Sequence, residues 1–140
     1  MARTFPFEVH TPSHLFFRGE VEEVIVTITD GEIGILAGHM ACISPVKSGF
    51  LRIRDRDGSW KNAFTSEGII EVKEHKTVLM SEAAEWGSEI DVDRAVKARD
   101  KAKEMLNDGM LKFETSNAVL ALRHAEYRLK VRELENKEQR

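Results

Sequence analysis

The sequence predicts an α+β protein in which an antiparallel β-domain is followed by an antiparallel two-helix hairpin. Short alternations of apolar and polar residues fill the first part of the chain, and long apolar stripes with helical spacing fill the last part. All three prolines and eight of the nine glycines lie before residue 88. We therefore expect a β-domain over residues 1–87 and a helical domain over residues 88–140.

The strands of the first domain are predicted by period-two alternation between turn residues. Three segments show it, residues 5–9, 24–29 and 51–54, and two short runs, 69–72 and 77–80, follow Gly68. Leu51 and Ile53 face one way and the arginines between and after them face the other, and Asp57-Gly58 then supplies a tight hairpin turn. Several short strands at this spacing predict a two-layer antiparallel sandwich or a barrel.

The helices of the second domain are predicted from their ends. Asp91 can cap a helix over residues 92–106, because its carboxylate can accept the free backbone N–H groups of the first turn. The alanine-rich interior favours this helix, and Gly109 can take the left-handed conformation that ends it. A second helix runs from about Phe113 to the terminus, and the short connection predicts an antiparallel hairpin.

The seam between the two helices is expected to be thin. The first helix offers Ala95, Ala98 and Ala102, followed by Met105 or Leu106. The second carries a wide apolar face made of Phe113, Asn117, Leu120, His124, Tyr127, Val131 and Leu134, with Ala118, Leu122, Ala125 and Leu129 beside it. At ~25 cal/mol per Å2 of buried apolar surface, alanine methyl groups stabilise the pair little. We expect the hairpin to dock on something else, to fold back on the β-domain, or to separate.

The composition excludes several classes of protein. Hydrophobic residues make up 41% and charged residues 32%, which is typical of a soluble globular chain. The net charge of -3 argues against a nucleic-acid binder. The single cysteine, Cys42, leaves no internal disulfide and no cysteine metal cluster. We recognise no signal peptide, transit peptide or apolar span of roughly 20 residues, and so expect a cytoplasmic setting.

The segment 30-DGEIGILAGHM-40 holds three glycines and a histidine, which raises the question of a phosphate loop. A phosphate loop needs a Lys-Ser or Lys-Thr pair before a helix, and the dinucleotide fingerprint needs Gly-x-Gly-x-x-Gly; the segment has neither. His39 has no recognisable catalytic partner, and the five histidines lack metal-ligand spacing. We therefore expect turns of a β-domain here, and neither a catalytic nor a metal site in the chain.

Arginines on the two predicted helices allow another kind of site. Folding the hairpin could bring Arg94 near Arg123 and Arg128, and guanidinium groups suit phosphate oxygens because they offer paired N–H donors. The same residues could instead form a solvated charged face. The pattern alone leaves both interpretations open.

Several segments resemble the ε subunit family of F-type ATP synthases, in the right order and over almost the full chain. They are 31-GEIGILAGH-39, 47-KSGFLRI-53, 66-SEGIIEV-72, 90-IDVDRA-95 and 121-ALRHAEYRLKV-131. Three departures from the family pattern lie in the first domain: Ala37 stands where the family has proline, 40-MACI-43 lacks the usual Pro-Leu after Gly-His, and Glu67 stands at the first glycine of a Ser-Gly-Gly turn.

The resemblance implies a flattened N-terminal β-sandwich of about ten strands and a C-terminal hairpin, in a subunit that is not an enzyme and requires no cofactor. The sandwich would bind the γ subunit and the c-ring in the central stalk during proton-driven ATP synthesis. The movable hairpin would reach the α and β subunits and inhibit ATP hydrolysis. The subunit would bind no nucleic acid and would lie on the cytoplasmic face of the bacterial inner membrane only through the complex. The alternative is a free-standing β-domain with a coiled-coil tail, acting as an adaptor.

The resemblance also implies site residues. Some bacterial members bind ATP as a regulatory ligand around the Ile-Asp-x-x-Arg-Ala motif, and the matching residues here are Glu85, Ile90, Asp91, Arg94, Ala95 and Arg128. The other arginine of that site falls at His124, with Arg123 one place earlier and about 100° away around the helix. Asp91 and Arg94 could instead cap the helix and anchor the hairpin. Glu32 and His39 lie on the segment that faces the c-ring and stalk in this family.

Overall fold

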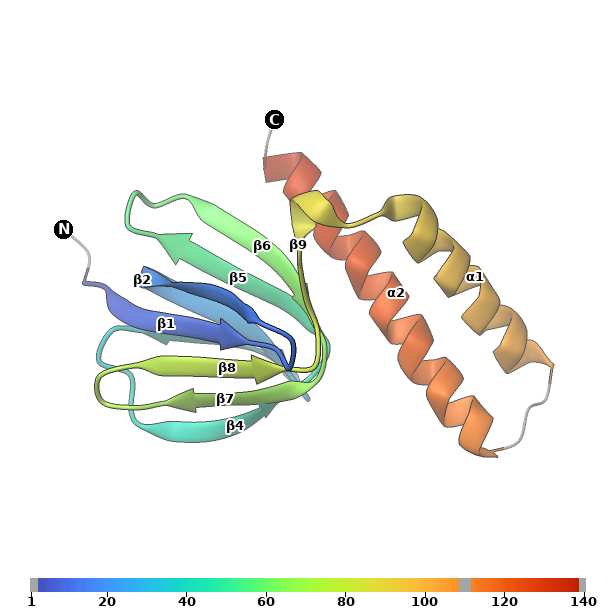
Figure 1. Ribbon diagram of the computed structural model, residues 1–140, viewed down its shortest axis with the longest axis horizontal. Helices are drawn as coiled ribbons and strands as arrows, with labels where there is room; N and C mark the ends of the chain where they lie inside the picture. The colour runs from blue at the N-terminus through green and yellow to red at the C-terminus, as the bar shows by residue number, and fades with distance from the viewer. Residues whose placement is uncertain (1–2, 109–111, 139–140) are drawn as a thin grey trace.

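In a computed structural model, which describes residues 3–108 and 112–138, nine strands precede two α-helices (Figure 1). The strands are β1 (Phe5–His10), β2 (Leu15–Ile28), β3 (Gly31–Leu36), β4 (Cys42–Val46), β5 (Gly49–Asp55), β6 (Trp60–Thr65), β7 (Gly68–Val72), β8 (Thr77–Ser81) and β9 (Ala84–Trp86). The helical part comprises the short 3-10 helix η1 (Gly87–Glu89), α1 (Val92–Asn107) and α2 (Lys112–Glu138). Gly109 and the side chain of Phe113 lie outside the described part, so the predicted helix stop and the first position of the apolar stripe are not covered.

The strands form one hydrogen-bonded sheet in the order β4-β7-β8-β1-β2-β5-β6-β9, with β3 paired to β2. The predicted antiparallel arrangement is confirmed for every pair except one: β1 runs parallel to β8, with Phe7 opposite Thr77. No hairpin joins β1 to β8, so no turn fixes their relative direction. The described residues contain nine strands, close to the expected ten.

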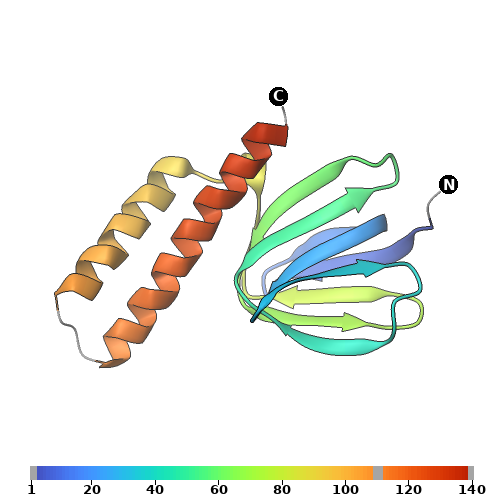
Figure 2. The same cartoon turned by 180° about the vertical axis from the view of Figure 1, so that it is seen from behind.

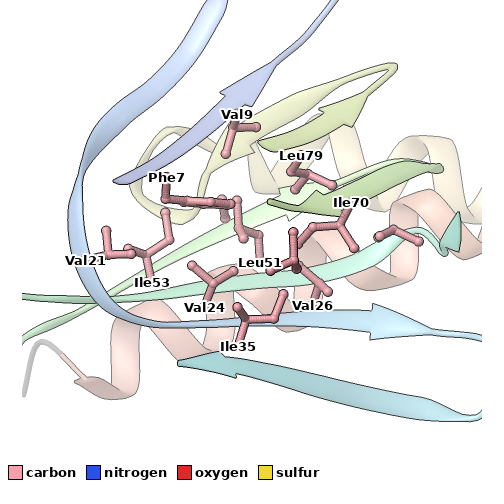
Figure 3. Packing of buried hydrophobic residues seen from close by; sticks show 13 residues of the cluster. Phe7, Val9, Val21, Val24, Val26, Ile35, Leu51, Ile53, Ile70 and Leu79 are labelled. Carbon is pink, nitrogen blue, oxygen red and sulfur yellow. The ribbon is translucent and has the colours of Figure 1, made fainter. Parts of the chain in front are cut away.

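The long strand β2 allows the sheet to fold over into two layers. Its register is irregular between Val21 and Glu23, where pairing with β1 gives way to pairing with β3 and β5. Side chains from both layers meet in one core (Figure 3), in which Phe7, Leu51 and Leu79 are fully buried. The sandwich core is therefore built from the strands alone.

The helical hairpin stands at one end of the sandwich, and α2 lies between α1 and the strands in both views (Figures 1 and 2). The most deeply buried positions of the two helices are mostly alanines: Ala95 and Ala102 on α1, Ala118 and Ala125 on α2. The seam is thin, as predicted. Val131 of α2 instead packs against Phe64 and Ile90 at the sandwich, so the hairpin has folded back on the β-domain.

Candidate nucleotide pocket and hairpin contacts

A polar pocket of about 340 Å3 lies where the sandwich, α1 and α2 meet. Its lining residues are Glu85 of β9, Glu89 of η1, Asp91, Arg94, Ala95 and Ala98 at the start of α1, and Arg128 of α2. This volume is within the range of small-molecule sites. The fold therefore brings together five of the sequence-predicted residues from three separate parts of the chain.

The start of α1 is fixed by its cap and by the residue before it. Oδ1 of Asp91 accepts a hydrogen bond from the backbone N–H of Arg94 at 3.1 Å, as expected of a capping residue. Ile90 is only 4% exposed and packs with Phe64 and Val131. Ile90 therefore does not line the pocket. It anchors the chain next to the pocket in an apolar contact with the sandwich and α2.

Arg128 joins α2 to the sandwich inside the pocket. Its Nε donates to Oε1 of Glu85 at 2.6 Å, and its guanidinium lies 4.5 Å from the centre of the Phe64 ring. A charge-assisted hydrogen bond and an aromatic face together fix the orientation of the guanidinium group. The same side chain thus serves both the pocket and the attachment of the helix.

The charge balance of the pocket is slightly negative, because three carboxylates face two guanidinium groups. Within the described residues the side chain of Arg94 makes no ion pair, so its N–H donors can take an anion directly. Arg128 already donates from Nε to Glu85, so an anion bound there would share its guanidinium group with that carboxylate. No group of three or more His, Cys, Asp or Glu residues in residues 3–108 and 112–138 is arranged to hold a metal ion.

The structure does not bring Arg123 to the pocket. Its Nε and Nη2 donate to the side-chain and backbone oxygens of Ser48 at 2.8 and 2.9 Å. Five positions along a helix turn the side chain by about 140°, which separates Arg123 from Arg128. His124, at the position of the missing arginine, instead lies 2.9 Å from Oε1 of Glu67 and packs edge-on against Phe64.

Burial and hydrogen bonds act in opposite directions on the ionisation of Glu67, which contacts His124. Burial raises the pKa of the Glu67 carboxyl, but hydrogen bonds from its own backbone N–H and from the side chains of His124 and Ser48 outweigh burial and hold the pKa below its usual range. The sandwich therefore presents a stabilised carboxylate to α2.

The two residues predicted to face the stalk lie at opposite ends of β3, and both are exposed. Glu32 pairs with Thr27 beside the β2–β3 turn, and His39 follows the other end of the strand. The His39 ring donates from Nδ1 to the carbonyl oxygen of Met40 at 2.8 Å, and Gly38 turns the chain there with a φ of +84°. A strand of this length spans about 20 Å, so one small group cannot contact both residues.

An exposed apolar face on β4, β7 and β8 was not predicted from the sequence. Ile69 and Met80 are cross-strand neighbours and are 45% and 46% exposed, and Ile43 is 69% exposed. Ile43 shares their face, because Pro45, two residues on, lies opposite Ile69. The available signal was that residues 69–72 and 77–80 are apolar on both faces. The pocket residues Glu89 and Ala98 were also missed, and no motif marks them.

Comparison with known proteins decides the family. Residues 4–87 match the family described as ATP synthase, Delta/Epsilon chain, beta-sandwich domain, and residues 88–133 match its long alpha-helix domain. This chain belongs to the ATP synthase epsilon-chain family. It is 45% identical over 132 residues to the ATP synthase epsilon chain of Caldanaerobacter subterraneus subsp. tengcongensis, covering 94% of this chain and 95% of that one. The epsilon chain of Caldicellulosiruptor bescii is 40% identical over 135 residues, covering 96% and 97%.

Solved structures share the epsilon-family fold at low identity. A chain of the Euglena gracilis mitochondrial ATP synthase, in an OSCP/F1/c-ring assembly, has a TM-score of 0.80 at 19% identity, covering 90% of this chain and 79% of that chain. A chain of the Tetrahymena thermophila mitochondrial ATP synthase, in a central stalk and c-ring assembly, has a TM-score of 0.67 at 11% identity, covering 94% and 98%. In the present chain, no helix among the described residues is both long and apolar enough to cross a membrane.

Proposed function

We propose that this epsilon-family chain is a non-catalytic subunit of the central stalk, that its sandwich binds the γ subunit and the c-ring, and that its hairpin is a movable inhibitor of ATP hydrolysis. The match of both domains to the family, over nearly the whole chain, carries the assignment to the complex. The attachment of α2 to the sandwich supports the movement of the hairpin.

The docked hairpin rests on a small apolar contact surrounded by polar ones. Val131 packs with Phe64 and Ile90, beside Phe50 and Tyr127. The polar contacts of α2 include Arg123 with Ser48, His124 with Glu67, Arg128 with Glu85, and Arg132 with the carbonyl oxygens of Gly87 and Ser88. Each polar contact replaces contacts with water, so it contributes only about 0.5–3 kcal/mol net, with the upper end for bonds to charged groups. The docked arrangement can therefore be balanced against one in which the hairpin binds the α and β subunits.

The exposed apolar face of β4, β7 and β8 is the proposed surface for the γ subunit. Ile43, Ile69 and Met80 lie on it, and a contiguous apolar patch on a folded protein marks an interaction site. Glu32 and His39 are the proposed contacts for the c-ring and stalk. Because they lie at opposite ends of β3, they would meet different parts of the assembly. The chain would then lie on the cytoplasmic face of the membrane only through these partners.

ATP is the proposed regulatory ligand of the pocket. Glu85 from the sandwich, Arg94 from α1 and Arg128 from α2 line it together, so the complete pocket exists only when the hairpin is docked. A ligand that binds one arrangement shifts the equilibrium by its differential affinity. Bound ATP would hold the hairpin down, with an affinity limited by the three carboxylates and by the absence of Arg123.

Association with the other subunits tests the assignment. The tagged chain is co-expressed with α, β and γ subunits and purified at moderate salt concentration. We expect it to co-elute with γ and with the α and β subunits. Elution of the chain alone, while the remaining subunits assemble, would favour a free-standing adaptor instead.

A further inference from the structure

We propose that Asn62 is a latch that holds the last turns of α2 on the sandwich, and that loss of its hydrogen bonds releases the hairpin. The latch itself is a property of the isolated chain. Its regulatory consequence rests on the proposed function, because only a hairpin that inhibits hydrolysis when released gives the latch a role in the complex.

The latch is a buried amide whose hydrogen-bonding groups are all used. Asn62 of β6 is 2% exposed. Its Nδ2 donates to Oε2 of Glu135 at 3.0 Å and to Oε2 of Glu138 at 2.7 Å, and its Oδ1 accepts from Nε of Arg52 at 2.9 Å. One amide from the sandwich therefore binds two carboxylates of the helix with its two N–H groups.

Arg52 completes the cluster. It donates from Nη2 to Oε1 of Glu138, and its guanidinium lies 4.6 Å from the centre of the Trp60 ring. Glu135 and Glu138 are three positions apart and so lie on one side of α2. The sandwich thus offers the guanidinium group of Arg52 and the two N–H groups of Asn62 to the carboxylates of Glu135 and Glu138. This set of donors matches two carboxylates specifically.

Gly87 allows α2 to come close enough for these contacts. A Cβ atom at Gly87 would lie 3.1 Å from Cβ of Glu135 and 3.2 Å from the carbonyl oxygen of Asn62. Arg132 donates to the carbonyl oxygens of Gly87 and Ser88 at 3.0 and 2.6 Å beside it. A side chain at this position would push α2 away from the amide.

Exposed apolar side chains lie on α2 before Arg123. Val119 and Leu120 are 52% and 41% exposed, and with Lys47 and Arg123 they line a cleft of about 480 Å3 beside the sandwich. The contacts of α2 described above run from Arg123 to Glu138, and those of Glu135 and Glu138 lie in its last turns.

The substitution Asn62→Asp tests the latch. It keeps the shape of the side chain but replaces two N–H donors by a carboxylate that faces Glu135 and Glu138. In the isolated full-length chain we expect the hydrogen-exchange protection of the α2 amides to fall by about tenfold or more, while β1 and β2 keep theirs. The matched control is Asn136→Asp, which adds the same charge to the same part of α2 at an exposed position. We expect it to change protection by less than about twofold.

A triple variant separates the latch from general damage to the fold. Adding Glu135→Gln and Glu138→Gln to Asn62→Asp gives the helix two amides that can donate to the new carboxylate, and protection of α2 should return. Three results would overturn the latch: unchanged protection in Asn62→Asp, an equal loss in the strands, or no recovery in the triple variant. ATP hydrolysis by the assembled complex is measured separately, so a failure of the inhibitory function leaves the exchange result standing.

Discussion

Nε of Arg128 in α2 donates to Oε1 of Glu85 in β9 at 2.6 Å, above the ring of Phe64. This pair belongs at once to the pocket and to the attachment of the hairpin. A ligand that takes Arg128 from Glu85 therefore alters how the helix is held on the sandwich. The link between nucleotide and hairpin movement that we propose acts through this contact.

Arg94 should carry much of any ATP binding. It is exposed and forms no ion pair among the described side chains, so Arg94→Ala removes phosphate donors without removing a contact of the fold. A hydrogen bond to a charged group contributes about 1.5–3 kcal/mol, so we expect affinity to fall by roughly ten- to a hundredfold in calorimetric titration of the isolated chain. The control is Arg99→Ala, because Arg99 lies on the same helix and pairs with Asp100. Identical heats for all three proteins would remove the site.

Val131→Ala should loosen the hairpin. Val131 is fully buried against Phe64 and Ile90, and deleting buried methyl groups costs about 1–3 kcal/mol with the cavity left behind. We expect a corresponding loss of hydrogen-exchange protection in α2. Val119→Ala, at a position that is 52% exposed, should change the free energy of opening of α2, measured by the same exchange, by less than about 0.5 kcal/mol. Equal effects of the two substitutions would show that the apolar contact does not hold the helix.

Local patterns predicted the elements well, because alternation and caps act over a few residues. The Asp57-Gly58 turn is present, with Gly58 at a φ of +84°, and the helix expected over residues 92–106 runs from Val92 to Asn107. The parallel pairing of β1 with β8 could not be predicted, because it depends on how distant strands meet. The exposure of Ile69 and Met80 could not be predicted for the same reason. A strand pattern indicates two faces, but it does not indicate which face other elements cover.

For the pocket, too, the residues within a local motif could be predicted, and contacts between residues far apart in the sequence could not. The motif around Asp91 and Arg94 located one wall of the pocket, and helical spacing gave the reason to doubt Arg123. The contacts of Asn62 with Glu135 and Glu138 join residues more than seventy positions apart. No sequence pattern marks such a contact, because it is created only when the hairpin folds back.

The stability of the folded chain should decrease in acid through Glu67. Burial raises the pKa of this carboxyl, but the hydrogen bonds from its backbone N–H, His124 and Ser48 leave it below the ordinary value. A carboxyl whose pKa is lower in the folded chain than in the unfolded chain stabilises the fold fully above its unfolded pKa of about 4.3, and this stabilisation is lost as the pH falls through the folded pKa. The free energy of unfolding should therefore decrease as the pH falls below about 5, and Glu67→Gln should flatten that decrease. An equally steep decrease in Glu67→Gln would assign the acid sensitivity to other groups.

The exposed apolar face should be needed for the γ subunit and not for the fold. Ile69→Lys places a charge on this face at a half-exposed position, so the free energy of unfolding should change by less than about 1 kcal/mol. Binding of γ, measured with the purified subunits, should weaken by about tenfold or more. Val92→Lys makes the same change on α1, where Val92 is 41% exposed, and should leave binding unchanged. If both variants bind γ like the unaltered chain, the surface lies elsewhere.

The most direct measurement compares ATP hydrolysis by complexes that carry either the whole chain or residues 1–87. The sandwich core contains no residue of the hairpin, so the shortened chain should still assemble with the other subunits. If the hairpin is the inhibitor, the complex with residues 1–87 hydrolyses ATP faster under conditions in which the complete chain inhibits. Equal rates for the two assembled complexes under those conditions would contradict the account.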